Sequence, residues 1–187
     1  MSRWHLDCAA RSVRNRGVIA YPTEAVYGLG CAPCFPEAVQ RILALKGRRP
    51  GKGLILVASA ADQFDALIDL DALPAKQRQR VLESWPGPVT WIVPARPGVP
   101  AWLSGGRPAL AVRVSDHPLV RALCDRVGAL VSTSANPEGA PPARDARRVR
   151  AYFDDRLDYL LPGRVGALGR PTEIRDARSG TILRRGG

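Results

Sequence analysis

The chain has 187 residues, 45% of them hydrophobic, and carries 28 Lys and Arg against 17 Asp and Glu, for a net charge of +11. This fits one soluble globular domain, and no stretch approaches the roughly 20 apolar residues of a membrane helix. Residues 1–16 lack the apolar segment of a secretory signal, so we expect a cytoplasmic location and no membrane partner. The basic excess is mostly Arg and is spread along the chain, which favours anionic partners such as nucleotides, phosphates or RNA.

The first half of the chain alternates between helical and strand patterns. Apolar residues at helical spacing, with Gly or Pro at the ends, predict helices, and short apolar runs between turn residues predict strands. A Gly-x-Gly sequence is interpreted as a turn. In chain order the predictions are a helix at 7–16, a strand at 18–21, a turn at 28–30, a helix at 36–45 and a strand at 54–58.

The same alternation continues to the C-terminus. After helices at 61–68 and 74–85 and a strand at 89–93, the segment 94–108 is rich in Pro and Gly and predicts a long functional or mobile loop. The remaining predictions are strands at 109–114, 129–133, 159–161, 172–175 and 181–183, and helices at 119–127 and 145–153. The alternation predicts the α/β class, with one domain over residues 1–187.

Two glycine-rich segments resemble nucleotide-binding motifs but do not match them. Residues 47–53 are one residue short of a phosphate-binding loop, have Gly53 in place of Ser or Thr, and follow a helix rather than a strand. The glycines at 28 and 30 are followed by Pro33 where the dinucleotide fingerprint requires Gly or Ala. Any nucleotide must therefore be bound in another way.

Two polar clusters lie at expected junctions between elements. Thr23 and Glu24 directly follow a strand, where α/β proteins usually bind ligands, although a capped turn is an almost equal alternative. Residues 46–52 contain four cations between a helix and a buried strand. Arg grips phosphate or carboxylate through two parallel hydrogen bonds, so this segment is a candidate anion site, with a solvated charge run as the alternative.

Two further clusters belong to strands. Alternation places Arg113 on the opposite face from Leu110, Val112 and Val114, and a buried guanidinium there needs either a protein carboxylate or an anionic ligand. At the end of the strand that follows, three polar side chains share one face and could donate to phosphate oxygens, unless they only form a turn. They are Ser132, Ser134 and Asn136.

The four cysteines and two histidines do not form a recognisable metal or nucleophile site. Cys31 and Cys34 are a Cys-x-x-Cys pair, but only the scattered Cys8, Cys124, His5 and His117 could complete a zinc site. We expect no metal ligands in the protein and interpret the pair as small residues packed beneath a loop.

Several segments together resemble the YrdC-like family of threonylcarbamoyl-AMP synthases. The resemblance covers almost the whole chain in order and includes Pro-Thr-Glu-Ile-Arg-Asp near the C-terminus. The matching segments are 21–30, 46–48, 85–90, 111–114, 132–136, 171–176 and 182–184. The resemblance implies a single YrdC-like domain with a twisted mixed sheet, flanking helices and a basic cavity.

The resemblance also implies substrates and residue roles. The substrates would be ATP with Mg2+, L-threonine and bicarbonate, and the product threonylcarbamoyl-AMP would serve a tRNA modification. The signature set is Lys46, Arg48, Ser134 and Asn136. The ATP contacts are Arg48, Lys52, Ser134, Asn136 and Arg184. The threonine contacts are Thr23, Arg113, Ser132 and Thr172. Lys46 and Arg48 are both expected at the cavity rim.

Other functions compete with this one. A non-catalytic RNA-binding module of the same fold is the main alternative, but it has no need for residues on the threonine side. A carbamoyl-transfer domain of a maturation enzyme would sit inside a much longer chain. Weak binding of tRNA or double-stranded RNA, and downstream threonylcarbamoyl-transferase partners, are expected in addition to the small substrates.

Overall fold

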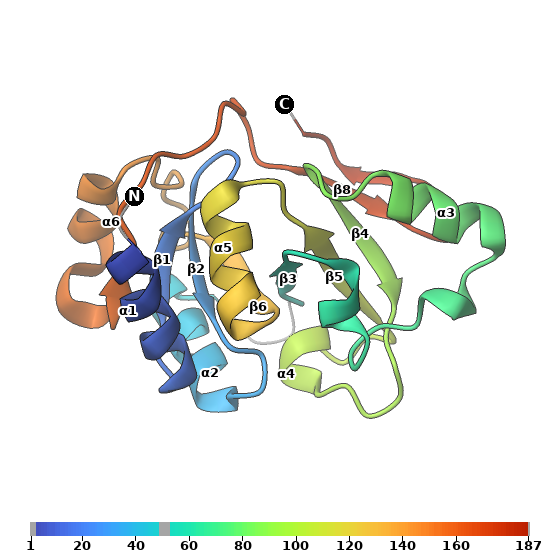
Figure 1. Cartoon of the computed structure of the whole chain (residues 1–187), viewed down its shortest axis with the longest axis horizontal. Helices are drawn as coiled ribbons and strands as arrows, with labels where there is room; N and C mark the ends of the chain where they lie inside the picture. Colours follow the sequence, from blue (N-terminus) through green and yellow to red (C-terminus); the bar gives the residue numbers. More distant parts are fainter. Residues whose placement is uncertain (1–2, 49–52, 187) are drawn as a thin grey trace.

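The computed structural model describes residues 3–48 and 53–186, and within them nine strands form one mixed sheet (Figure 1). The strand order is β7-β1-β2-β6-β3-β5-β4-β8-β9. The strands are β1 (Ile19–Pro22), β2 (Tyr27–Cys31), β3 (Ile55–Ala58), β4 (Val89–Pro94), β5 (Ala109–Val114), β6 (Leu130–Ser134), β7 (Tyr159–Leu160), β8 (Glu173–Asp176) and β9 (Ile182–Arg184). The predicted α/β class with a mixed sheet is confirmed.

Six α-helices and three short 3-10 helices accompany the sheet in the described residues. The α-helices are α1 (Arg3–Arg14), α2 (Pro36–Lys46), α3 (Ala75–Glu83), α4 (Ala101–Ser104), α5 (Pro118–Val127) and α6 (Ala146–Phe153). The 3-10 helices are η1 (Ala61–Phe64), η2 (Leu70–Ala72) and η3 (Asp154–Arg156). None of the helices in the described part of the chain is long and apolar enough to cross a membrane.

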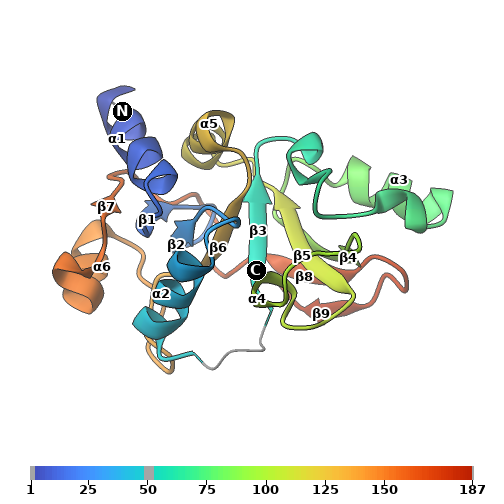
Figure 2. The same ribbon diagram turned by 90° about the horizontal axis from the view of Figure 1, so that it is seen from below.

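The helices lie on both faces of the sheet and bury two cores. Helices α1 and α5 pack side by side on one face, where Val13 and Leu123 meet Val57 and Leu130 of the sheet. Helices α2 and α6 lie on the opposite face, as Figure 2 shows, and belong to the larger core. The amphipathic spacing that predicted these helices thus corresponds to real buried faces.

Local signals explain where several helices begin and end. Pro36 and Pro118 each occupy the first turn of a helix, where the missing N–H costs nothing. Gly47 ends α2 with φ 65°, a left-handed conformation that favours glycine. The Asp145 side chain accepts a hydrogen bond from the Arg148 backbone N–H and caps α6. These boundaries agree with the sequence prediction to within a few residues.

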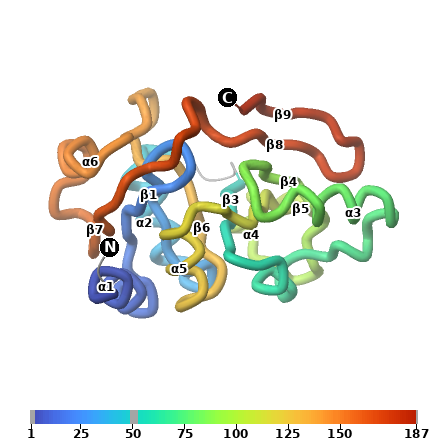
Figure 3. The backbone as a smooth tube through the Cα atoms, turned by 45° about the horizontal axis from the view of Figure 1, so that its top comes forward, coloured from blue at the N-terminus to red at the C-terminus, as the bar shows by residue number. Residues whose placement is uncertain are grey.

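A long connection, residues 161–172, carries the chain from β7 at one edge of the sheet to β8 in its other half (Figure 3). It is tied to the turn after β1, since Gly166 N donates to Thr23 O at 2.9 Å and Leu168 N donates to Glu24 O at 3.1 Å. The Tyr27 hydroxyl donates to Gly163 O at 2.7 Å. This connection places the β8–β9 hairpin beside β4, although β4 and β8 are far apart in the sequence.

Three local predictions are wrong. The 28–30 segment is the middle of β2 and not a turn. A Cβ at Gly30 would lie 2.7 Å from both the Tyr21 ring and Val131 O. Glycine is therefore required there by close packing. The helix expected at 61–68 is only the single 3-10 turn η1, and the loop expected at 94–108 contains the short helix α4.

Candidate functional site

A cavity of about 600 Å³ opens over the middle of the sheet. Most residues that the sequence singled out line it, although they come from distant segments. They are Thr23, Lys46, Arg48, Arg113, Ser132, Ser134, Asn136, Thr172 and Arg184. Lys52 lies outside the described residues. The polar clusters at the strand ends thus meet at one site.

Strand alternation explains why the cavity has polar walls. Ile55 and Val57 share one face of β3, and Leu130 and Ser132 share one face of β6. Helices α1 and α5 cover Val57 and Leu130, whereas the cavity lies over the neighbouring Ile55 and Ser132. The uncovered part of that face is therefore where polar side chains are tolerated.

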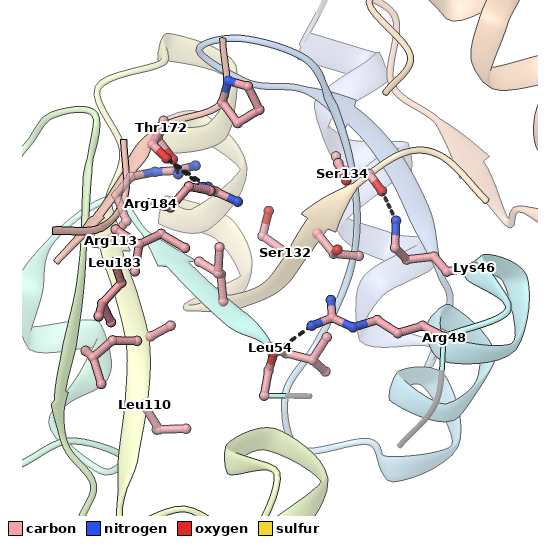
Figure 4. A pocket seen from close by; sticks show the side chains of 18 of the residues that line it. Lys46, Arg48, Leu54, Leu110, Arg113, Ser132, Ser134, Thr172, Leu183 and Arg184 are labelled. Carbon is pink, nitrogen blue, oxygen red and sulfur yellow. Dashed lines mark hydrogen bonds between the residues drawn. The ribbon is translucent and has the colours of Figure 1, made fainter. Parts of the chain in front are cut away.

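Two groups of polar side chains, each with two cations, face each other across the cavity, as Figure 4 shows. We call them the Arg113 end, which comprises Arg113, Thr172 and Arg184, and the Arg48 end, which comprises Lys46, Arg48 and Ser134. They differ in how far the protein itself satisfies their hydrogen-bond donors.

At the Arg113 end, the guanidinium is held by a buried network. Arg113 Nη2 lies 3.2 Å from Glu24 Oε2, and the two side chains are only 6% and 9% exposed. The Ser115 hydroxyl donates to Glu24 Oε1 at 2.6 Å. Arg113 Nη1 donates to Thr172 Oγ1 at 2.5 Å, while its Nε is buried without a partner in the described structure. The sequence left the partner of Arg113 open, and it is the protein carboxylate of Glu24.

Arg184 brings a second guanidinium to the same end. Its Nε and Nη2 donate to Thr172 O at 3.2 and 2.8 Å. Burial, and next the positive charge of Arg113, lower the pKa of Arg184. Glu24 is the one carboxylate that either guanidinium contacts in the described residues. The Arg113 end therefore retains positive charge for an anionic ligand.

The hydroxyl groups beside Arg113 are positioned by buried neighbours. The Tyr21 hydroxyl donates to Ser132 Oγ at 2.8 Å, and burial raises the pKa of Tyr21. Ser132 accepts this bond, so its own hydrogen is left to donate. Thr23 Oγ1 donates to Val26 O at 2.7 Å. A Cβ at Gly28 would come within 3.3 Å of Thr23 and 3.4 Å of Ser132, so glycine keeps this wall open.

Lys46 is buried, so the expectation that it lies at the rim is wrong. It is 5% exposed, and its Nζ donates to Ser134 O at 2.5 Å and to Asn136 O at 2.8 Å. Burial, and next the charge of Arg48, lower the pKa of Lys46 to about 8. A lysine at the end of α2 reaches the end of β6 because the two element ends converge there. Lys46 thus fixes the turn that carries Ser134 and Asn136.

Arg48 is half-buried at the mouth of the cavity. Its Nη2 donates to Gly53 O at 3.1 Å, and its Nε is buried without a partner in the described part of the chain. Burial lowers the pKa of Arg48. Arg107 also lines the cavity but was missed, because it lies in a segment interpreted only as a loop. The one sequence feature that could have indicated Arg107 is its position, as a cation, just before the strand that contains Arg113.

The cysteines lie away from the cavity lining. Cys31 is buried in β2, where burial raises its pKa to about 12, and Cys34 is exposed. The interpretation that both pack beneath a loop is therefore wrong. The described residues contain no group of three or more His, Cys, Asp or Glu that could hold a metal ion.

The arrangement can bind a polyanion and stabilise charge on it. Guanidinium, ammonium and hydroxyl donors line the cavity, and the lining in the described residues includes no His or Cys. Preorganised donors of this kind suit phosphoryl transfer, which needs positioning and charge stabilisation more than a side-chain nucleophile.

Known proteins resemble the chain over nearly its whole length. The family model Sua5/YciO/YrdC, described as "Telomere recombination", matches residues 11–186. The chain is 55% identical over 178 residues to the threonylcarbamoyl-AMP synthase of Halorhodospira halophila, covering 95% of this chain and 92% of the relative. It is 51% identical over 181 residues to that of Stutzerimonas stutzeri, covering 97% of each chain.

Solved structures share the fold. P. abyssi Sua5 complexed with L-threonine superposes with a TM-score of 0.92 and 29% identity, over 100% of this chain. This chain spans 55% of the length of that protein. E. coli YciO is similar in fold, with a TM-score of 0.84 at 23% identity. The superposition covers 99% of this chain and 90% of the YciO chain.

Proposed function

The chain belongs to the Sua5/YciO/YrdC family, and on that premise we propose that it is a threonylcarbamoyl-AMP synthase. It makes threonylcarbamoyl-AMP and pyrophosphate from ATP, L-threonine and bicarbonate. The observation that carries the proposal is the convergence of distant polar segments on one cavity. Relatives of nearly equal length and about half identical sequence bear this name. The reaction makes the enzyme a nucleotidyltransferase.

The Arg113 end is proposed to bind L-threonine. Thr23, Arg113, Ser132 and Thr172 are the contacts. Arg113 lines the cavity and is held by Glu24 and Thr172, so its guanidinium is preorganised to bind a carboxylate. The P. abyssi relative was crystallised with L-threonine, which supports an amino-acid site in this fold.

ATP is proposed to span the two ends. Arg48, Ser134 and Asn136 contact it at one end, and Arg184 contacts it beside Thr172 at the other. Lys52, which lies outside the described residues, is a further proposed ATP contact. Mg2+ prefers oxygen ligands and usually enters with the phosphates. Ser134 and Glu138 line the cavity with suitable oxygens, so the residues fit such an ion. When bound, it would neutralise phosphate charge.

The chemistry needs no side-chain nucleophile. The threonine amine and bicarbonate form a carbamate with loss of water. A carbamate oxygen then attacks the α-phosphorus of ATP, and the bond to the β-phosphate oxygen breaks to release pyrophosphate. Arg48 and Arg113 neutralise charge and align the reactants, while Lys46 holds the turn that presents Ser134 and Asn136.

The product is proposed to serve the modification of tRNA to N6-threonylcarbamoyladenosine by downstream transferase proteins. The cytoplasm, which holds both ATP and tRNA, is the proposed location. The charge of +11 supports weak, salt-dependent binding of tRNA or double-stranded RNA. A module that only binds RNA explains neither the buried Arg113 network nor the names of the relatives.

A pyrophosphate assay with each component omitted in turn tests the proposal. Release should require both L-threonine and bicarbonate, because the nucleophile does not exist until both are bound, and RNA should be dispensable. Release without bicarbonate would indicate an ordinary amino-acid-activating enzyme. No release, combined with tight RNA binding, would favour the binding module.

A further inference from the structure

We propose that Arg107 acts with Arg48 to bind the β- and γ-phosphates of ATP and so holds the pyrophosphate leaving group. This inference rests on the proposed function and adds a residue to it. Arg107 lies between α4 and β5 and lines the same cavity as Arg48.

The two guanidiniums border the same residue. Arg48 Nη2 donates to Gly53 O at 3.1 Å, and Arg107 Nη1 lies 3.6 Å from where a Cβ on Gly53 would be. Both guanidiniums therefore lie near residue 53. Neighbouring cations on one cavity wall repel each other unless an anion lies between them, and a phosphate chain supplies that anion.

The backbone around Arg107 is anchored, although its side chain is exposed. Leu54 N donates to Leu103 O at 3.2 Å, and Gly106 N donates to Ser104 Oγ at 3.2 Å. Among residues 3–48 and 53–186, no hydrogen bond or ion pair involves the Arg107 guanidinium. A solvated surface arginine is common, but the backbone of this one is anchored beside the cavity, and within the described residues its guanidinium donors have no protein partner.

The direction of β5 places Arg107 opposite the threonine site. Ala109, Ala111 and Arg113 alternate along one face of the strand and all line the cavity. At about 3.3 Å per residue, Ala109 and Arg113 are roughly 13 Å apart. The small alanine side chains leave this path clear. With threonine at Arg113, the leaving group departs toward Arg107 and solvent.

The test compares ligands that differ only in the phosphates. Dissociation constants for ATP, pyrophosphate, AMP and L-threonine would be measured by calorimetry on the wild type, Arg107→Ala and Arg107→Lys. Arg147→Ala is the control, because Arg147 is exposed on α6, outside the cavity lining, and its loss changes the net charge equally.

Arg107→Ala should weaken ATP and pyrophosphate binding about tenfold, the usual worth of one charge-assisted contact. AMP and L-threonine should change less than twofold, Arg107→Lys should retain part of the affinity, and Arg147→Ala should behave like the wild type. Equal losses for AMP and pyrophosphate, unchanged ATP binding in Arg107→Ala, or no pyrophosphate binding by the wild type would each overturn the inference. None of these outcomes depends on product formation, so a failure of the proposed synthase activity would be recognised separately.

Discussion

The two ends of the cavity differ in how the protein holds their cations. At the Arg113 end, the guanidinium contacts Glu24, Thr90 and Thr172, Ser115 donates to Glu24, and only Arg113 Nε lacks a partner in the described structure. At the Arg48 end, Arg48 has one carbonyl acceptor in the described structure. A network of several contacts fixes one geometry, which suits a small rigid ligand, whereas the less paired guanidinium of Arg48 suits a flexible and highly charged phosphate chain.

The largest expected effect, on the free energy of unfolding, comes from breaking the hydrogen-bond network around Arg113. Glu24→Ala leaves Arg113 buried without its carboxylate and should lower the free energy of unfolding by about 3–5 kcal/mol. Urea denaturation measures this. The matched control is Asp71→Ala, which breaks an exposed pair with Arg78 and should cost less than about 1 kcal/mol. Equal costs for both variants would show that the Arg113 end is not held by Glu24.

The corresponding change at the Arg48 end should affect turnover and not folding. Arg48→Ala should lower kcat/KM by a factor equivalent to about 2–4 kcal/mol, because a donor to the reacting phosphates is lost. Steady-state pyrophosphate release measures this, and the urea midpoint should stay close to that of the wild type. Unchanged turnover would mean that Arg48 is only a solvated charge.

A packing change behind the Arg113 end should have a smaller effect. Gly30→Ala forces a Cβ to within 2.7 Å of Val131 O and the Tyr21 ring, and overpacking of this kind costs about 1–3 kcal/mol. Tyr21 supports Ser132, so the affinity for L-threonine should fall as well. Gly139→Ala is a contrasting variant, since its Cβ would meet nothing within 4 Å and only its φ of 82° is strained. If Gly30→Ala bound L-threonine as tightly as the wild type, the hydrogen bond from Tyr21 to Ser132 would not contribute to threonine binding.

The smallest expected effect is a pH dependence at Lys46. Its pKa is about 8 in the folded protein, below the ordinary value of 10.5, so the unfolded chain binds more protons between these pH values. The contribution of Lys46 to stability should therefore rise as pH increases through this window, by about 2 kcal/mol between pH 7 and pH 9.5. The measurement is the difference in unfolding free energy between wild type and Lys46→Met at pH 7 and pH 9.5. A difference that falls with pH would contradict the assigned burial.

The sequence predicted elements and polar positions better than it predicted contacts. Strand 109–114 was placed correctly, and alternation gave the face of Arg113. The partner Glu24 is 89 residues away in sequence, so only the order of strands in the sheet brings them together. Gly28 and Gly30 were interpreted as a turn because the close packing of Tyr21 against β2, which requires glycine at position 30, is visible only in the folded structure. Lys46 looked exposed because the ends of α2 and β6 converge only in three dimensions.

The most direct test of the difference between the two ends is a pair of binding measurements. Dissociation constants for L-threonine and ATP would be determined by calorimetry for wild type, Arg113→Lys and Arg48→Ala. Arg113→Lys keeps the charge near Glu24 but loses the planar donors, so it should weaken L-threonine more than about tenfold and ATP less than threefold. Arg48→Ala should show the reverse pattern. Equal weakening of both ligands in both variants would contradict the division of the cavity into a threonine end and a phosphate end.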